Sequence, residues 1–178
     1  MARLPIQQVE TATGSNKDIF AALQKALGMV PNMTMVMANS PALLQAYVGF
    51  SSALGHAKLS PQVREQVALL TAESNACTYY LSTHSVLGKL VGLNQSQIDS
   101  ARRSESADPK TGGALTFAQS VLDRRGGVSE SDVKKVRDAG FSDGEIAEIV
   151  AAVAINVFTN FFNRTADVDV DCPHVEVL

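Results

Sequence analysis

The stretch from Glu65 to His84 gathers the side chains best suited to chemistry. It holds Cys77, one of two cysteines in the chain, and His84, one of three histidines, and it begins at the carboxylate of Glu65. A thiol, an imidazole and a carboxylate are the groups that proteins commonly use as nucleophile, proton relay and base. These three residues are therefore the first candidates for a catalytic site.

Two predicted helices position these side chains. The first runs from about Ser60 to Ser74, because Ser60-Pro61 supplies an N-cap followed by proline at the first helical position. The second runs from about Cys77 to Val91 after a turn near residues 74–76, and Ser74 or Asn75 is expected to cap it. Cys77 would then lie in the first turn, where free N–H groups and the helix dipole favour a thiolate.

The helical period of 100° per residue assigns the faces of the second helix. Cys77, Tyr80 and His84 share one face, which is expected to pack inward. The opposite face is expected to meet solvent and carries Thr78, Ser82, Ser85 and Lys89. On the first helix Glu65 has apolar neighbours, so its carboxylate is either paired or has a raised pKa. His84 is a plausible partner for Glu65 across the turn.

The composition bounds the class of protein. With 178 residues, 46% hydrophobic content and 19% charged content, the chain is expected to form one globular domain over residues 1–178. Residues 1–14 are expected to be an N-terminal arm and residues 165–178 a C-terminal tail. The net charge of −3 and the absence of long Lys or Arg runs argue against a nucleic-acid partner.

Other sequence features point to the cytoplasm. Two cysteines far apart do not make a disulfide scaffold, and the N-terminus lacks the apolar region of a signal peptide. The most apolar stretch, Ile146 to Phe162, is shorter than the roughly 20 residues of a membrane span, so we expect a buried helix and no membrane partner. Neither a cofactor motif nor a metal site is visible, since Cys172 and His174 in one Cys-Pro-His run do not match metal-ligand spacing.

The remaining periodicity predicts an all-α chain. Helices are expected over about 15–27, 33–37, 41–54, 94–103, 113–124, 129–139 and 142–164, with residues 104–111 as a loop. Asn156, Asn160 and Asn163 form a stripe on the last helix. Buried amides need partners, so this stripe bonds to other helices or subunits, or contacts a substrate. The tail alternates apolar and polar residues and could pack as an extended arm on a neighbour.

The run from Glu65 through Asn75-Ala76-Cys77-Thr78-Tyr79-Tyr80 to His84 resembles the AhpD-like, carboxymuconolactone decarboxylase family. The surrounding stretches MVPNM, ANSPALLQAY, LSPQVREQVAL and GFSDGEIAEIV are similar to its peroxidase-related branch, so the resemblance covers nearly the whole chain. It implies an AhpD-like bundle of about seven to nine helices. It also implies a homo-oligomer, such as a dimer, trimer or hexamer.

Tyr80 departs from the family pattern. The resemblance implies a Cys-x-x-Cys pair that reduces a peroxide and closes to a disulfide, but Tyr80 stands where the second cysteine belongs. Cys77 and His84 are seven residues apart, roughly 10 Å along a helix, whereas Tyr80 and His84 are at i and i+4 and can touch. The histidine is thus placed to serve position 80, which is a phenol in this chain.

Three functions remain open on the sequence. In an alkylhydroperoxidase-like antioxidant enzyme, Cys77 would form a sulfenic acid that an outside thiol reduces. Glu65 and His84 would move protons through Tyr80 or water. In a carboxymuconolactone-decarboxylase-like enzyme acting on a lactone acid, Glu65 would be the base, Tyr80 the hydrogen-bond donor and His84 the relay. In a catalytically silent oligomeric binding protein, Cys77 would be an ordinary buried cysteine.

Overall fold

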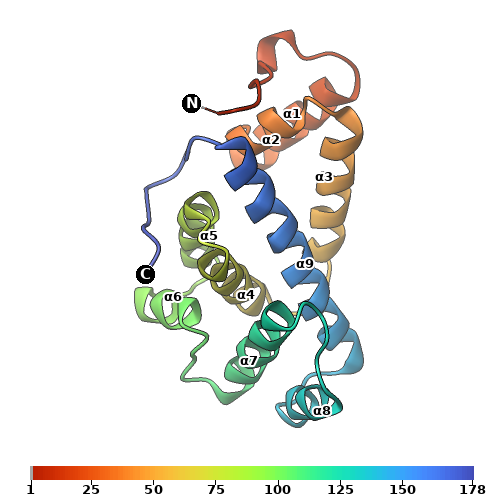
Figure 1. The fold of residues 1–178 in the computed structure, drawn as a ribbon. Coiled ribbons are helices and arrows are strands. Elements are labelled where there is room, and N and C mark those ends of the chain that lie inside the picture. Colours follow the sequence, from red (N-terminus) through yellow and green to blue (C-terminus); the bar gives the residue numbers. More distant parts are fainter. Residues whose placement is uncertain (1) are drawn as a thin grey trace.

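The computed structural model describes residues 2–178, and the regular structure in that range is helical (Figure 1). A short 3-10 helix, η1 (Val9–Thr11), precedes nine α-helices. These are α1 (Gly14–Leu27), α2 (Asn32–Met37), α3 (Pro41–Gly55), α4 (Pro61–Ser74), α5 (Thr78–Leu90), α6 (Gln95–Arg102), α7 (Pro109–Asp123), α8 (Glu130–Asp138) and α9 (Asp143–Ala166). The prediction of an all-α bundle is confirmed.

The helix starts follow the capping residues of the sequence. The side chain of Ser60 accepts a hydrogen bond from the Val63 N–H, and Asn94, Ser129 and Ser142 each form a capping box. The predicted loop over 104–111 is wrong at its end, because α7 already begins at Pro109. Asp108 caps it by accepting from the Thr111 N–H at 2.9 Å. An N-cap followed by proline is the same signal that was used for α3 and α4.

The α4 and α9 helices form the centre of the bundle. The α4 helix packs against α5, α6, α7 and α9, while α9 crosses the molecule and also packs against α3, α5, α7 and α8 (Figure 1). By length and composition α9 could cross a membrane, with 39% of its apolar window buried. Its packing against five other helices identifies it as a core helix, as predicted.

The C-terminal tail packs against other helices of the same chain. After Ala166 it leaves the end of α9 and runs past α5 to α6 (Figure 1). Asp171 accepts a hydrogen bond from the backbone N–H of Asn32 at 2.6 Å, and the Val175 N–H donates to Ser82 Oγ at 3.0 Å. The backbone of Leu178 reaches Glu73 at 2.6 Å. The tail therefore ties α2, α4 and α5 together.

This tail changes the solvent exposure of α5. Ser82 and Ser85 were predicted to meet solvent, but both are buried. Ser82 accepts its hydrogen bond from the tail, and α6 also packs against α5. The periodicity of a helix shows which residues share a face, but not which distant segment covers a polar face.

Candidate functional site

The turn between α4 and α5 differs from its prediction. Asn75 is the C-cap of α4, and Ala76 adopts a left-handed conformation with φ of 49°. The Cys77 N–H donates to the Ala72 carbonyl at 2.9 Å, at the end of α4. Cys77 itself is the N-cap of α5, in place of the predicted Ser74 or Asn75. The thiol thus sits at the helix start rather than within the first turn.

Glu65 and His84 form a hydrogen-bonded pair across the α4–α5 hairpin. His84 Nδ1 and Glu65 Oε2 lie 2.7 Å apart, and the side chains are 14% and 17% exposed, respectively. Glu65 can therefore lie among apolar neighbours on α4, because its carboxylate is paired. A carboxylate that orients an imidazole is a common arrangement for proton transfer.

Tyr80 lies between this pair and the core. Its ring centroid is 4.7 Å from that of His84, which confirms the expected contact at i and i+4. Its hydroxyl lies within hydrogen-bond reach of Thr159 on α9 and Tyr47 on α3. Burial raises the pKa of Tyr80 well above its ordinary value. The side chain is therefore a neutral phenol whose ring, rather than its hydroxyl, meets His84.

Cys77 occupies a different environment from the Glu65–His84 pair. Its side chain is 1% exposed, and burial raises the pKa of the thiol. Weaker opposing effects come from the backbone N–H groups of Tyr80 and Tyr79 and from the positive charge of Arg164. The expectation that the helix start lowers the Cys77 pKa is wrong, because desolvation of the sulfur outweighs the dipole.

The end of α9 completes the surroundings of Cys77. Asn160 Oδ1 accepts a hydrogen bond from Asn75 Nδ2 at 3.1 Å, and Arg164 Nη1 donates to the Asn75 carbonyl at 2.7 Å. Asn160 thus bonds outside its own helix, as one of the two predictions stated, whereas Asn156 donates to the Ala152 carbonyl within α9. Asn163 reaches Met33 Sδ on α2 through its Nδ2 at 3.2 Å.

Sequence reasoning missed three residues around this site. Tyr47 and Thr159 approach the Tyr80 hydroxyl, and Arg164 acts on Cys77. Tyr47 lies on a helix full of apolar residues and reads as core, so no spacing signal marks it. Arg164 follows the asparagine stripe directly, and a cation at the end of a polar stripe is a signal that could have been used.

The second cysteine and the tail histidine lie elsewhere. Cys172 Sγ is 3.8 Å from Thr83 Oγ1 on α5, and His174 Nε2 is 3.4 Å from Glu176 Oε1. Over residues 2–178, no group of three or more His, Cys, Asp and Glu side chains is placed to hold a metal ion.

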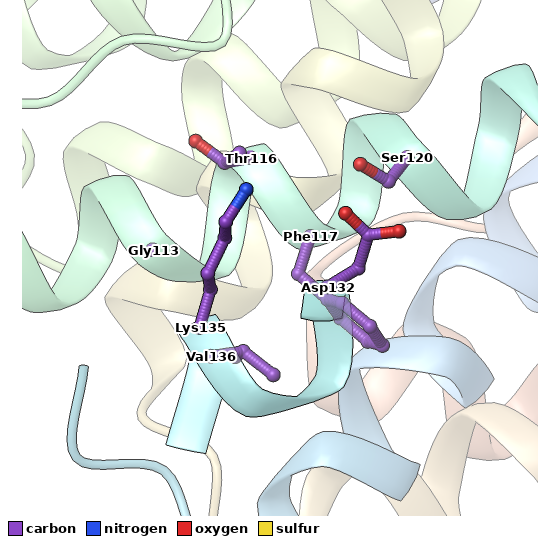
Figure 2. A pocket seen from close by; sticks show the side chains of 7 residues that line it. All are labelled: Gly113, Thr116, Phe117, Ser120, Asp132, Lys135 and Val136. Atoms are coloured by element: carbon purple, nitrogen blue, oxygen red, sulfur yellow. The ribbon is translucent and has the colours of Figure 1, made fainter. Parts of the chain in front are cut away.

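A hollow of about 220 Å³ opens between α7 and α8 (Figure 2). It is lined by Gly113, Thr116, Phe117, Ser120, Asp132, Lys135 and Val136. None of the predicted site residues belongs to its wall. Asp132 is already bonded to Ser129 and Arg124. The hollow thus lies apart from the Glu65–His84 pair and from Cys77.

Solved structures share this fold. Neither protein-family models nor curated protein sequences match the chain. The "alkylhydroperoxidase AhpD core" structure of an uncharacterized peroxidase-related protein from Ralstonia eutropha JMP134 matches with a TM-score of 0.86 and 21% identity, covering 96% of this chain and 92% of that one. A peroxidase-related protein from Silicibacter sp. TM1040 matches with a TM-score of 0.85 and 22% identity, covering 94% and 91%.

A third similar structure belongs to a named enzyme. The debrominase Bmp8 matches with a TM-score of 0.78 and 21% identity, covering 95% of this chain and 91% of that one. A cysteine-to-alanine variant of Bmp8 was solved in complex with 2,3,4-tribromopyrrole. These likenesses define the class: an all-α protein with the AhpD core fold. At this level of identity they show the fold alone.

Proposed function

We propose that this protein reduces hydroperoxides through the thiol of Cys77, with an outside thiol as reductant. The observation that carries the proposal is the placement of Cys77 at the N-cap of α5. There burial raises the pKa of the thiol, and the Tyr79 and Tyr80 N–H groups and the Arg164 charge act in the opposite direction. The shared fold with peroxidase-related proteins supports the same chemistry, and the debrominase Bmp8 was solved as a cysteine-to-alanine variant in complex with 2,3,4-tribromopyrrole.

The reaction needs one cysteine and two equivalents of outside thiol. The Cys77 sulfur attacks the terminal oxygen of the hydroperoxide, the O–O bond breaks, and the products are Cys77 sulfenic acid and an alcohol that takes the thiol proton. One outside thiol then forms a mixed disulfide and releases water, and a second regenerates Cys77 as the outside disulfide leaves. Sulfur is oxidised and the peroxide oxygen is reduced, so electrons balance without a second motif cysteine.

Mass spectrometry after addition of stoichiometric tert-butyl hydroperoxide tests this proposal. We expect the Cys77 peptide to gain one oxygen or one molecule of added thiol. Cys77→Ser should abolish turnover with a thiol reductant, whereas Cys172→Ser is the matched control and should retain it. A Cys77 that stays a thiol while peroxide is present in excess would overturn the proposal.

A second candidate function is favoured by the Glu65–His84 pair. Unlike Cys77, this pair is partly exposed, and Tyr80 beside it is a neutral phenol. A carboxylate–imidazole pair next to a phenol suits acid–base chemistry on a lactone acid, with Glu65 as base, His84 as relay and Tyr80 as hydrogen-bond donor. The hydroxyl of Tyr80 now meets Tyr47 and Thr159, so this role requires its ring to turn.

A panel of lactone acids separates the two functions. We expect turnover by the second route to be lost in His84→Ala and kept in Cys77→Ser. Loss in both variants, or in neither, counts against acid–base chemistry at this pair. If no variant and no substrate gives turnover, the protein is a catalytically silent binding protein on the same fold.

We also propose that the chain forms a homo-oligomer. Phe158 and Phe161 on α9 are 37% and 55% exposed, and Phe50 on α3 is 41% exposed, while α3 and α9 pack side by side. Large exposed aromatic side chains gathered on adjacent helices are typical of protein interfaces. Light scattering after gel filtration tests this, and Phe161→Glu should shift the mass towards the monomer.

A further inference from the structure

Two buried asparagines on α9 carry polar atoms without partners. Asn160 is 0% and Asn163 3% exposed. Within residues 2–178, Asn160 Nδ2 and Asn163 Oδ1 have no hydrogen-bond partner. Buried polar groups in proteins are nearly always paired, either with protein or with an ordered water molecule. A free donor and a free acceptor one turn apart on a helix therefore define a place for such a molecule.

The other half of each amide is already fixed. Asn160 Oδ1 accepts from Asn75 Nδ2 at 3.1 Å, and Asn163 Nδ2 donates to Met33 Sδ at 3.2 Å. Neither amide can turn to satisfy its free atom without breaking the bond that it has. The free N–H of Asn160 and the free carbonyl of Asn163 are thus held in place before any ligand arrives.

A hydrogen bond links Asn160 to the turn that precedes Cys77. Asn75, which holds Asn160, is two residues before Cys77, and its carbonyl accepts from Arg164 Nη1 at 2.7 Å. The charge of Arg164 in turn acts on the Cys77 thiol. Residues three and four apart share one face of a helix, so Asn160, Asn163 and Arg164 project from the same side of α9. A cation, an N–H donor and a side-chain carbonyl acceptor thus share one side of the end of α9, where Asn160 and Arg164 bond to the turn before Cys77.

We propose that Asn160 and Asn163 bind the –O–OH group of a hydroperoxide at Cys77. The Asn160 N–H donates to the oxygen attached to carbon, and the terminal O–H donates to the Asn163 carbonyl. This assignment rests on the proposed function. It fits a hydroperoxide because that group carries a donor and an acceptor on adjacent atoms, as the two amides require.

The arrangement assigns each residue a part in the step. The Cys77 sulfur attacks the terminal oxygen, whose hydrogen stays on it as the sulfenic acid forms. The O–O bond breaks, and negative charge develops on the oxygen attached to carbon. Asn160 donates a hydrogen bond to that oxygen, and the Arg164 charge also favours the developing negative charge. The oxygen then takes the thiol proton and leaves as the alcohol. A donor fixed at the position of a developing charge is an effective catalytic group.

The test compares two asparagines of the same helix. Asn156 is also buried, but its Nδ2 already donates to the Ala152 carbonyl at 2.7 Å, so Asn156→Ala is the matched control for Asn160→Ala. Both are made in a Cys172→Ser background, which leaves Cys77 as the only thiol. The rate constant for oxidation of Cys77 by tert-butyl hydroperoxide should fall about 10-fold or more in Asn160→Ala, and by less than about 3-fold in Asn156→Ala.

Alkylation of Cys77 by iodoacetamide separates binding from a structural effect. Iodoacetamide needs the thiol but not the peroxide site, so its rate should be similar in the two variants. Equal losses of oxidation and alkylation in Asn160→Ala would overturn the inference while leaving the proposed function in place. Oxidation of Asn160→Ala at the rate of the control would overturn the inference as well.

A second measurement does not depend on turnover or on the folding of a variant. A crystal of the wild-type protein soaked in tert-butanol, the product alcohol, should show its oxygen between Asn160 Nδ2 and Asn163 Oδ1. An alcohol bound elsewhere, with only water between the amides, would overturn the site. If Cys77 of the wild type resists peroxide, the proposed function fails, and this soak alone decides whether the amides hold a hydroxyl oxygen.

Discussion

The start of α5 and its middle carry the two halves of the proposed catalytic site in opposite surroundings. At the start, Cys77 is sealed from solvent, and burial raises its pKa despite the helix N–H groups and Arg164. About two turns further on, His84 is paired with Glu65 at 2.7 Å and partly open to solvent. The thiol is protected but poorly ionised, and the proton-transfer pair is accessible but has no nucleophile beside it.

Tyr80 stands between Cys77 and His84 on α5. Its ring lies against His84, and its hydroxyl turns away to Tyr47 and Thr159. Position 80, which lies beside the Glu65–His84 pair, thus holds a neutral phenol, and a phenol cannot act as a thiolate nucleophile does. We propose that a tyrosine at position 80 can leave both halves of the proposed site intact and still uncouple them.

Tyr80→Cys should remove the separation and give the largest effect. A thiol at position 80 lies one turn from His84 and one turn from Cys77, so the imidazole can take its proton and Cys77 can close a disulfide with it. We expect hydroperoxide turnover to rise about 100-fold or more, the usual contribution of a positioned base. The measurement is peroxide consumption with a dithiol reductant. Tyr80→Phe, which keeps the ring without the thiol, is the control.

The result also decides which half is disabled. If Tyr80→Cys gives turnover and the further change His84→Ala removes it, the Glu65–His84 pair can still transfer protons. A Tyr80→Cys enzyme no faster than wild type would contradict the view that Tyr80 uncouples the halves.

The thiol half makes a prediction about pH. Because burial raises the Cys77 pKa above its ordinary value of 9.0, the reactive thiolate is scarce at neutral pH. In the Cys172→Ser variant, alkylation of Cys77 should quicken about tenfold per pH unit and go on rising above pH 9. Arg164→Gln should move the profile further up, since the Arg164 charge lowers this pKa. A plateau below pH 9 would contradict the sealed thiol.

The same shift has a consequence for stability. A thiol whose pKa is raised by folding stabilises the folded state fully below its unfolded pKa, and this contribution is lost as pH rises through the folded value. The pKa values of Tyr47, Tyr79 and Tyr80 are also raised by burial. Urea unfolding should therefore show a nearly constant free energy between about pH 7 and pH 9 and a steep fall above pH 10.

A substitution between α7 and α8 should lower the stability of the fold without affecting Cys77 or the Glu65–His84 pair. A Cβ on Gly113 would lie 2.6 Å from the Cβ of Ala139, whereas a Cβ on Gly112 would have its nearest neighbour at 3.8 Å. We expect Gly113→Ala to lower the free energy of unfolding by about 1–3 kcal/mol. Gly112→Ala, the control in the same helix, should raise it by about 0.5–1 kcal/mol. Cys77 oxidation should be the same in both variants while they remain folded.

Local signals predicted most of the fold. Each Ser-Pro or Asn-x-x-Gln type of start placed a helix, because a cap is a contact between residues three apart in sequence. The Glu65–His84 pair was also within reach, since an unexplained carboxylate faced a histidine across one short turn. The contact of Tyr80 with His84 followed from helix geometry alone.

What sequence reasoning missed depends on contacts between distant segments. The raised pKa of Cys77 reflects how tightly other helices bury it, which outweighs the local dipole. Tyr47 and Thr159 come from two other helices, and no spacing links them to Tyr80. Ser82 was assigned to solvent because its helix shows a polar face there, and only the distant tail reveals that the face is covered.

Ser82→Ala should give the smallest effect and test that last contact. Ser82 Oγ is buried and accepts from the Val175 N–H at 3.0 Å, so alanine leaves that donor without its partner. We expect the free energy of unfolding to fall by about 1 kcal/mol, measured in urea. Thr78→Ala, at the half-exposed first position of α5, is the control and should change it by less than about 0.5 kcal/mol. Equal effects would mean that the tail adds little to the stability of α5, and that the polar face behaves as the helical period predicted.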